Sequence, residues 1–313
     1  MAIASPGAPA GTPNMGASVP HLNAAREPVE VERRRSTLLV VARSPKALAG
    51  AVILAVFILM AVLAPELAPY SPSASDFLPY LHPSAAHLLG TTSTGQDVVS
   101  QFIWGGRVTL EVAFLGGALT TALSTFVGLV SGALPGVGDE LVTVVTNIFL
   151  VIPALPLMVV LAAYINIGGI WPIIAVIVVT SWAWGARVIR AQVASLRARE
   201  YITFARLSGE RFFGVLWREI LPNIISLVSA TFLNAAIASI LAESALQFLG
   251  LGDPLQQSWG NMLYWANNGN ALLNGQWGWV LAPGLAIALT GGSFALVNFG
   301  LDEVVSPRMR DSR

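Results

Sequence analysis

The sequence predicts an all-α membrane protein with six transmembrane helices, and three observations support this fold class. Of the 313 residues 55% are hydrophobic and only 11% are charged, whereas soluble domains carry about 25% charged residues. The hydrophobic residues form separate blocks, each close to the roughly 20 residues that a helix needs to cross a bilayer. One long basic segment lies between two of these blocks and has the pattern of a short helix in a cytoplasmic loop. A soluble fold is therefore excluded.

The amino-terminal part of the chain divides into a tail and a first span. Residues 1–36 are rich in Ala, Pro, Gly and Ser and show no hydrophobic period, so we expect a disordered cytoplasmic tail. Residues 37–64 are assigned to the first transmembrane helix, because the stretch 47–64 is apolar and basic residues precede it. A cleaved secretory signal is the alternative, but its basic region would start far from the amino terminus and its cleavage position would be followed by Pro65.

An extracytoplasmic loop of residues 65–108 follows, and then a five-helix core of residues 109–310. Pro153 lies inside the third span, and membrane helices tolerate such residues when neighbouring helices satisfy the backbone. Gly128 and Gly132 have a small-xxx-small spacing, which predicts close helix approach. The five predicted spans of the core are residues 109–133, 141–165, 170–187, 220–242 and 279–300.

The distribution of Lys and Arg sets the expected orientation, because cytoplasmic loops carry an excess of these residues. All but one of the 17 basic residues fall before the first span, between the fourth and fifth spans or after the sixth. Only Arg107 falls on the outer side. We therefore expect both termini in the cytoplasm. Several tryptophans suit the aromatic belt at the outer interface, namely Trp104, Trp259, Trp265, Trp277 and Trp279.

Motifs of several enzyme classes are absent from the sequence. It contains no Cys, no G-x-S-x-G, no H-E-x-x-H, no cluster with metal-ligand spacing and no phosphate-binding G-x-x-x-x-G-K-[ST] loop. The histidines lie outside the apolar blocks, and we interpret His82 and His87 as solvated loop residues. A membrane enzyme would need a base at membrane depth, so this class is disfavoured, and a net charge of zero gives no indication of nucleic acid.

Two acidic residues lie near the apolar blocks, where a buried charge is costly and usually functional. Glu111 follows Arg107 by one helical turn, so we expect a local ion pair between them. Glu243 ends the fifth span, where it could face a water-filled pathway or contribute to packing at the outer surface. The run of intramembrane acids that is typical of a proton-driven carrier or an ion channel is absent.

The long inner loop, residues 195–222, is the most informative segment. Its apolar positions are compatible with a short helix whose polar face is basic, and Gly209 suits a left-handed helix stop. Such a helix has nothing apolar in its own chain to cover it, so it either lies on the lipid surface or inserts into a groove on a cytoplasmic partner. Phe212 and Phe213 follow, and we expect them to pack beneath the loop.

The spacing of Ala205, Gly209 and the Ile220-Leu221-Pro222 run resembles the EAA loop of binding-protein-dependent ABC importer permeases. In that family the loop forms the coupling helix that seats in the ATPase subunits. The resemblance therefore implies the type I ABC importer permease architecture, with a coupling loop at about 195–222. The residues that it assigns to ATPase coupling are Thr203, Phe204, Ala205, Arg206, Leu207, Ser208 and Gly209.

Two further segments resemble the dipeptide and oligopeptide permease C branch of this family. The first segment is similar to the LGTD, GRDVLSR and GARxSL signatures of the branch. The matching runs are Leu89-Gly90-Thr91, Gly95-Gln96-Asp97-Val98-Val99-Ser100 and Gly105-Gly106-Arg107-Val108-Thr109-Leu110. The second segment is similar to the EAALSFLGLG and PSWG signatures of the branch. The matching runs are Glu243-Ser244-Ala245-Leu246-Gln247-Phe248-Leu249-Gly250-Leu251-Gly252 and Ser258-Trp259-Gly260. The extracytoplasmic signature residues are Gly90, Asp97, Arg107, Glu243, Gly250, Gly252 and Trp259. Thr92, Gln96 and Gln101 are uncharged where the branch carries charge.

The resemblance implies a permease subunit that moves di- or oligopeptides inward across the cytoplasmic (inner) membrane of a prokaryote, as a multi-pass protein in the lipid bilayer. Its implied partners are a second homologous permease, two ATP-binding subunits and an extracytoplasmic substrate-binding protein, with no nucleic acid. ATP and magnesium would bind in the ATPase subunits, and this chain would bind no cofactor. The same branch serves oligosaccharides and nickel complexes, so these substrates remain alternatives. A non-transport membrane anchor or receptor is the alternative from another class.

Overall fold

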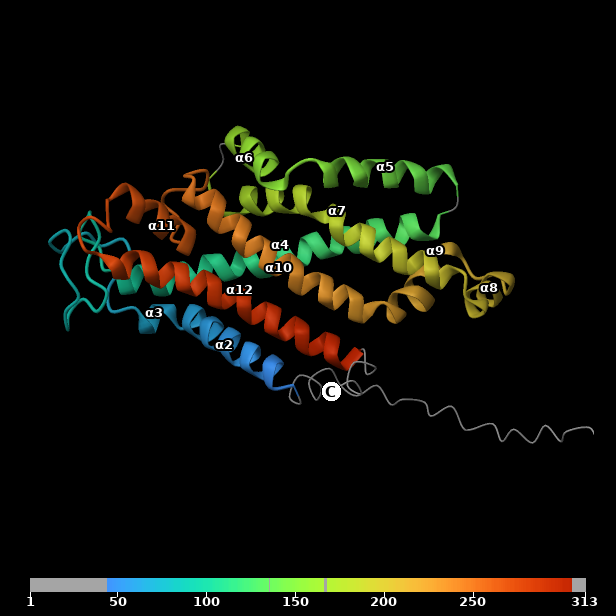
Figure 1. Cartoon of the computed structure of the whole chain (residues 1–313), viewed down its shortest axis with the longest axis horizontal. Helices are drawn as coiled ribbons and strands as arrows, with labels where there is room; N and C mark the ends of the chain where they lie inside the picture. The colour runs from blue at the N-terminus through green and yellow to red at the C-terminus, as the bar shows by residue number, and fades with distance from the viewer. Residues whose placement is uncertain (1–43, 135, 166–167, 306–313) are drawn as a thin grey trace, which may run out of the picture. The chain divides into compact units, whose positions relative to one another are not determined.

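The computed structural model describes residues 44–134, 136–165 and 168–305, which form a bundle of helices (Figure 1). Five of these helices are long and apolar enough to cross a membrane, and a bent pair gives a sixth span if it counts as one. In chain order the helical elements are α2 (Pro45–Val62), α3 (Ala64–Leu67), α4 (Val98–Ala133), α5 (Val137–Val151), α6 (Ala154–Tyr164), α7 (Ile170–Arg197), α8 (Glu200–Leu207), α9 (Phe212–Gly214), the π-helix η1 (Val215–Ile220), the 3-10 helix η2 (Leu221–Asn223), α10 (Ile225–Phe248), α11 (Trp259–Asn268) and α12 (Trp277–Val305). The all-α fold class is confirmed, while the predicted tail of residues 1–36 lies outside the described residues.

Helix α4 is the centre of the bundle and packs against both α7 and α10. Gly128 and Gly132 face α7. A Cβ built at Gly128 would lie 2.8 Å from Cβ of Ile189, and one built at Gly132 would lie 2.7 Å from Cβ of Val193. These separations leave no room for a larger side chain, so the two glycines permit the close approach of the helices. The small-xxx-small prediction is therefore confirmed.

The third predicted span is not one continuous helix. Residues 141–165 were expected to form a single span, but the chain forms α5 and α6, whose axes differ by 89°. The break lies at Ile152 and Pro153, where Ile152 adopts an extended conformation with ψ of 126°. Proline disfavours the helical region for the residue before it and has no N–H to donate, so its backbone chemistry explains the break.

The second span also starts earlier than predicted. Helix α4 begins at Val98, so the outer loop expected over 65–108 ends at Asp97. The Asp97 carboxylate accepts a hydrogen bond of 2.8 Å from the Ser100 N–H, which is a helix N-cap. The first turns of α4 pack against the segment between α3 and α4, which the sequence predicts to be extracytoplasmic and which we call the outer segment. Val98 and Ser100 are fully buried there. Apolar periodicity could not identify this start because polar residues take part in the packing.

The remaining span boundaries shift in the same way. Helix α7 continues past the predicted end at residue 187 to Arg197, and α10 begins at Ile225 rather than at residue 220. The chain before α10 forms the two irregular turns η1 and η2, and Pro222 lies in the second. A proline cannot donate to a regular helical ladder, which is consistent with a helix that starts only after it. The first and last spans become α2 and α12 instead of 37–64 and 279–300.

The outer segment between α3 and α4 folds back on the start of α4. His87 is only 5% exposed, and its Nδ1 lies 2.9 Å from Oδ1 of Asp97. The ring of His87 also packs 4.4 Å from Phe77 and 5.4 Å from Tyr70, measured between ring centroids. The prediction that His87 is a solvated loop residue is therefore wrong, whereas His82 is exposed.

The two ends of the long helices carry different structures (Figure 1). Helix α8 lies at one end, and α11 lies with the outer segment at the other. The outer segment contacts the chain that follows α11 directly. The Tyr80 hydroxyl donates to the Gly269 carbonyl at 2.9 Å, and the Gln276 amide donates to the Tyr80 carbonyl at 2.8 Å. These contacts close the outer end around α11.

Candidate functional site

The short helix predicted in the long inner loop is present as α8, and it ends as the sequence indicated. Gly209 has φ of +84°, in the left-handed region, and the Glu210 N–H donates to the Ala205 carbonyl at 3.2 Å. Ser208 N–H donates to the Phe204 carbonyl at 2.9 Å. This is the hydrogen-bond pattern of a glycine-terminated helix. A Cβ built at Gly209 would meet nothing within 4 Å, so only backbone conformation demands glycine there.

Ile202 and the partly buried Ala205 fix α8 to the bundle, whereas Phe204 and Leu207 are exposed. Ile202 is fully buried, in a cluster that includes Leu129 of α4 and Val193 of α7. Phe204 is 65% exposed and Leu207 is 78% exposed. The helix therefore packs on the bundle through its inner face, next to α7 and η1, and presents two large apolar side chains at the end of the bundle.

The segment after Gly209 extends this exposed surface. The rings of Phe212 and Phe213 lie 5.5 Å apart, and Phe213 is 61% exposed. The prediction that both phenylalanines pack beneath the loop is therefore wrong for Phe213, and Phe212 is also partly exposed at 37%. An open groove of about 760 Å³ lies here, and it is lined by Glu210, Arg211, Phe212, Phe213, Gly214, Trp217 and Arg218.

Three arginines of α7 near this end make polar contacts with other helices of the same chain. Arg190 of α7 makes a bidentate ion pair with Asp139 of α5, with N···O distances of 2.6 and 2.7 Å. Arg187 donates to the Asn147 side chain at 2.8 Å, and so adds a second polar contact between the same two helices. The carboxyl end of α4 is also capped across helices, because Arg197 of α7 donates to the Leu134 carbonyl at 3.1 Å. These arginines therefore hold α5 and the end of α4 against α7.

At the opposite end, three signatures that are far apart in the sequence meet in one buried contact, which we call the outer junction. It consists of Gly105, Gly106 and Thr109 of α4, of Glu243, Ser244 and Gln247 of α10, and of Ser258, Trp259 and Gly260 at the start of α11. The side chains of Glu243 and Trp259 are fully buried. The outer junction therefore joins three helices at their amino or carboxyl ends.

Small residues allow α11 to enter this junction. A Cβ built at Gly106 would lie 2.9 Å from the Trp259 ring, and one at Gly260 would lie 2.7 Å from Cα of Ser244. The Trp259 indole N–H donates to the Phe102 carbonyl at 3.0 Å. The indole therefore fills a notch that glycine leaves on α4 and satisfies its own polar group there.

Hydrogen bonds connect the three helices through Glu243. Its Oε2 accepts from the Ser244 hydroxyl at 3.2 Å and from the Thr109 hydroxyl at 3.5 Å. Thr109 Oγ1 in turn accepts from the backbone N–H of Trp259 at 3.2 Å. Of the two alternatives left open for Glu243, the structure favours packing at the outer end, since the side chain is fully buried among these groups.

Other signature residues lie outside the junction. Arg107 is exposed and lies 5.5 Å from the centroid of the Trp104 ring. The ion pairs of the described residues do not include Arg107 with Glu111, so that prediction is wrong. Gly90 has φ of +81° and its carbonyl accepts from the Val98 N–H at 3.2 Å, which places it beside the capped start of α4.

The predicted aromatic belt needs a correction for two of its members. Trp259 and Trp279 are 0% and 1% exposed and belong to one hydrophobic cluster, so they are core residues. Trp265 and Trp277 are 43% and 58% exposed. The sequence could not separate these pairs, because all four occupy the same outer region and differ only in tertiary packing.

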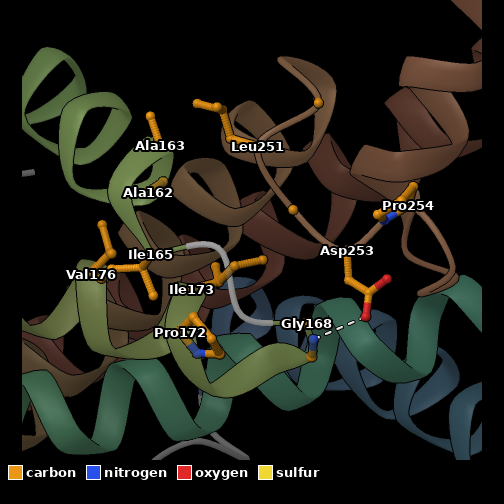
Figure 2. A pocket seen from close by; sticks show the side chains of 13 residues that line it. Ala162, Ala163, Ile165, Gly168, Pro172, Ile173, Val176, Leu251, Asp253 and Pro254 are labelled. Carbon is orange, nitrogen blue, oxygen red and sulfur yellow. Dashed lines mark hydrogen bonds between the residues drawn. The ribbon is translucent and has the colours of Figure 1, made fainter.

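A small pocket of about 210 Å³ lies near the outer junction, and the sequence analysis did not identify it (Figure 2). It opens between the end of α6, the start of α7 and the chain after α10. Asp253 points toward the turn before α7, where its Oδ2 accepts from the Gly169 N–H at 3.0 Å, and its Oδ1 accepts from the Leu255 N–H at 3.0 Å. Most other lining side chains are small or apolar, among them Ala162, Ile165, Pro172, Ile173 and Leu251. No group of three or more His, Asp or Glu side chains suited to a metal ion occurs among the described residues.

Comparison with known proteins identifies the family of the chain. The sequence profile of the family described as binding-protein-dependent transport system inner membrane component matches residues 124–311, and that of the N-terminal TM domain of oligopeptide transport permease C matches residues 37–84. The chain is 32% identical to the dipeptide transport system permease protein DppC of Bacillus subtilis over 270 residues, covering 84% of this chain and 82% of the relative.

Two other relatives cover a similar share. The oligopeptide transport system permease protein OppC of Bacillus subtilis is 30% identical over 267 residues, which cover 84% of this chain and 86% of the relative. The di/tripeptide transport system permease protein DppC of Pseudomonas aeruginosa is 32% identical over 282 residues, which cover 87% of this chain and 91% of the relative.

The first of these profiles covers the loop of residues 195–222 and all of the helices from α5 to α12. The relatives are named as permease proteins, so the family to which they belong supplies the membrane component of a transport system and not its ATP-hydrolysing part. With its several apolar spans, the chain is a multi-pass protein of the inner membrane. It belongs to the binding-protein-dependent transport system inner membrane components, the permeases of ABC importers.

Proposed function

We propose that this chain is the permease subunit of an ATP-driven importer that carries di- or oligopeptides inward across the cytoplasmic membrane. The observation that carries the proposal is α8, a helix whose Ile202 is buried in one cluster with residues of α4 and α7 and whose Phe204 and Leu207 are exposed at the end of the bundle. Large exposed apolar side chains on such a helix suit a groove on a partner. The names of the relatives support peptides as substrates rather than oligosaccharides or nickel complexes.

The proposed complex contains a second homologous permease, two ATPase subunits and an extracytoplasmic substrate-binding protein. The ATPase subunits bind ATP and magnesium and receive the coupling residues 203–209, so this chain itself holds no cofactor. Both of its termini lie in the cytoplasm. The exposed Trp217, together with Phe213, extends the apolar surface beyond α8 and suits the same ATPase contact.

Movement of α8 would reach the bundle through its buried contacts. Ile202 packs in one cluster with Leu129 and Val193, so displacement of α8 acts on the cytoplasmic ends of α4 and α7. Closely packed helices of this kind move as rigid bodies between discrete arrangements rather than deforming continuously. ATP-driven closure of the ATPase pair would therefore change the relation of α4 to its neighbours, and opening toward the outside would follow at the opposite end.

The ATPase contact is tested by copurification from native membranes. We expect the double change Phe204→Ser and Leu207→Ser to reduce recovery of the ATPase subunits at least about tenfold, because two large apolar side chains would lose their burial at the interface. Leu88→Ser is the matched control, since Leu88 is 67% exposed but lies in the outer segment. Equal recovery of ATPase subunits with the double variant and the control would favour a membrane anchor over a transport subunit.

The substrate is tested on the binding protein that copurifies with the wild-type chain. We expect mass spectrometry of its eluted ligands to find short peptides, and uptake of labelled dipeptide to be lost in cells that lack this chain. Eluted oligosaccharide, or a nickel complex, with unchanged peptide uptake would overturn the peptide assignment while leaving the permease role intact.

A further inference from the structure

Two buried polar atoms of the outer junction lack a hydrogen-bond partner in the part of the chain that the structure describes. They are Oε1 of Glu243 and Nε2 of Gln247. Buried polar atoms are almost always paired, so an unpaired acceptor and an unpaired donor in one site need an explanation. The two residues lie four positions apart on α10 and therefore share one face of the helix. One is an acceptor and the other a donor, so each could satisfy the other.

The second oxygen of the same carboxylate is already in use. Oε2 of Glu243 accepts from Thr109 of α4 and from Ser244 of α10, and Thr109 Oγ1 accepts from the N–H of Trp259 at the start of α11. The Thr109 bond is long, at 3.5 Å, which is the weak end of the hydrogen-bond range. Glu243 therefore has one weak bond toward α4 and an interaction with the Ser258 hydroxyl at the start of α11, while its Oε1 has no hydrogen-bond partner and lies on the same face of α10 as the unpaired Gln247 amide.

We propose that Glu243 is a positioning residue for the outer end of the transport path and that its carboxylate changes partners during the cycle. In the described state it ties α10 to α4 and, through Thr109, to the start of α11. In the opposite state it bonds the Gln247 amide, which pairs both unsatisfied atoms and releases Thr109. This inference rests on the proposed function, in which α4 and α10 move between two arrangements.

The surroundings of the junction make such an exchange specific to α11. Gly260 packs directly on α10, where its Cβ position would lie 2.8 Å from Cβ of Gln247. Movement of the Gln247 side chain therefore changes the surface on which α11 sits. Gly106 leaves α4 in similarly close contact with the Trp259 ring. Because neither Gly260 nor Gly106 has a side chain that could yield at its contact, a small displacement of α10 against α4 must also displace the start of α11.

Three variants separate the two states. Glu243→Leu removes both bonds, Glu243→Gln keeps an acceptor oxygen for the hydroxyl donors, and Gln247→Leu removes only the partner of the opposite state. Ser239→Ala is the matched control, because Ser239 is equally buried on α10 but donates only to the Ala235 carbonyl of its own helix, at 2.8 Å. Each variant is prepared in the complete complex with its ATPases and partner permease.

The position of α11 is measured by electron paramagnetic resonance. This chain contains no cysteine, so spin labels at Glu111→Cys on α4 and Asn267→Cys on α11 report one distance once any cysteines of the partner subunits are replaced. Both sites are exposed. The distance is recorded without nucleotide and after trapping with ATP and vanadate. Uptake, basal ATP hydrolysis and ATP hydrolysis stimulated by the loaded binding protein are measured on the same preparations.

We expect the wild type and Ser239→Ala to change this distance on trapping, and Gln247→Leu to keep the nucleotide-free distance in both conditions. In Gln247→Leu, uptake and stimulated hydrolysis should fall about three- to tenfold, the factor of one net hydrogen bond, while basal hydrolysis stays within about twofold. Glu243→Leu should broaden the distance in both conditions, and Glu243→Gln should restore most of the nucleotide-free distance.

A Gln247→Leu complex that changes distance and is stimulated like Ser239→Ala would overturn the exchange of partners. A Glu243→Leu complex with wild-type distances and uptake would overturn the positioning role altogether. A wild-type complex that changes distance but carries no peptide would refute the peptide substrate while supporting the role of Glu243, so the two proposals fail separately.

Discussion

At the scale of single residues, Gly209 shows how one backbone angle can carry a function. Its φ of +84° is open to glycine at no cost, whereas a β-branched residue is strained there. Nothing lies within 4 Å of its Cβ position, so replacement would act on the turn and not on packing within the chain. Substitutions at Gly209 therefore change the backbone conformation after α8 without disturbing side-chain packing in the core.

We expect Gly209→Val to abolish transport while membrane insertion stays intact, because strain of about 1–2 kcal/mol would displace the turn from its ATPase contact. Gly209→Asn should keep most of the activity, since asparagine tolerates the left-handed region. Uptake normalised to the amount of chain in the membrane measures both. Normal uptake by a well-inserted Val variant would show that this turn is not needed for coupling.

At the scale of elements, α5 is held by polar contacts more than by apolar packing. Thr146 is the buried residue of this helix, while the Asp139–Arg190 pair and the Arg187–Asn147 bond join it to α7. Many of its apolar side chains are exposed on the isolated chain. Near the bend, Phe149 and Leu150 pack against the cluster that contains Trp182 of α7, so both ends of α5 are held against α7.

We expect Asp139→Ala to lower the thermal unfolding midpoint of the purified complex by a few degrees, with Glu140→Ala as the exposed control that leaves it unchanged. The side chains of Asp139 and Arg190 are 26% and 33% exposed, so solvent screening limits the pair to about 1 kcal/mol or less. Exchange of the two residues, Asp139→Arg with Arg190→Asp, should recover part of the loss. No recovery would mean that packing rather than charge sets the effect.

At the scale of the whole molecule, the sequence predicted the order of the apolar segments and the glycine stop of α8, because both are local patterns. It did not predict the bend at Pro153, since tolerance of proline depends on neighbouring helices. Burial of His87 and exposure of Phe213 were also missed, because each is decided by chain segments that fold back from elsewhere. The outer junction unites residues far apart in the sequence, and a single sequence carries no signal of that contact.

The orientation of the molecule in the membrane is open to a direct test on the same cysteine-free background. We expect Val137→Cys to react with a membrane-impermeant maleimide only from the cytoplasmic side, and Leu273→Cys only from outside. Both side chains are well exposed, at 70% and 87%, and neither belongs to the proposed ATPase contact, so accessibility to the reagent depends on the side of the membrane. Labelling of intact cells and of inverted vesicles gives the two measurements. The reverse pattern would place the termini outside.

The length of α4 gives this helix a mechanical role. Its 36 residues span about 54 Å at 1.5 Å per residue, against a hydrocarbon thickness of about 30 Å. Even at a tilt of about 40°, the upper end of the usual range, it would extend past the hydrocarbon. Helix α4 thus extends beyond the hydrocarbon at its ends, with the outer junction packed at its amino end and the cluster that contains Ile202 of α8 packed at its carboxyl end. A rotation of about 10° about its midpoint would carry each tip roughly 5 Å, close to one helical turn.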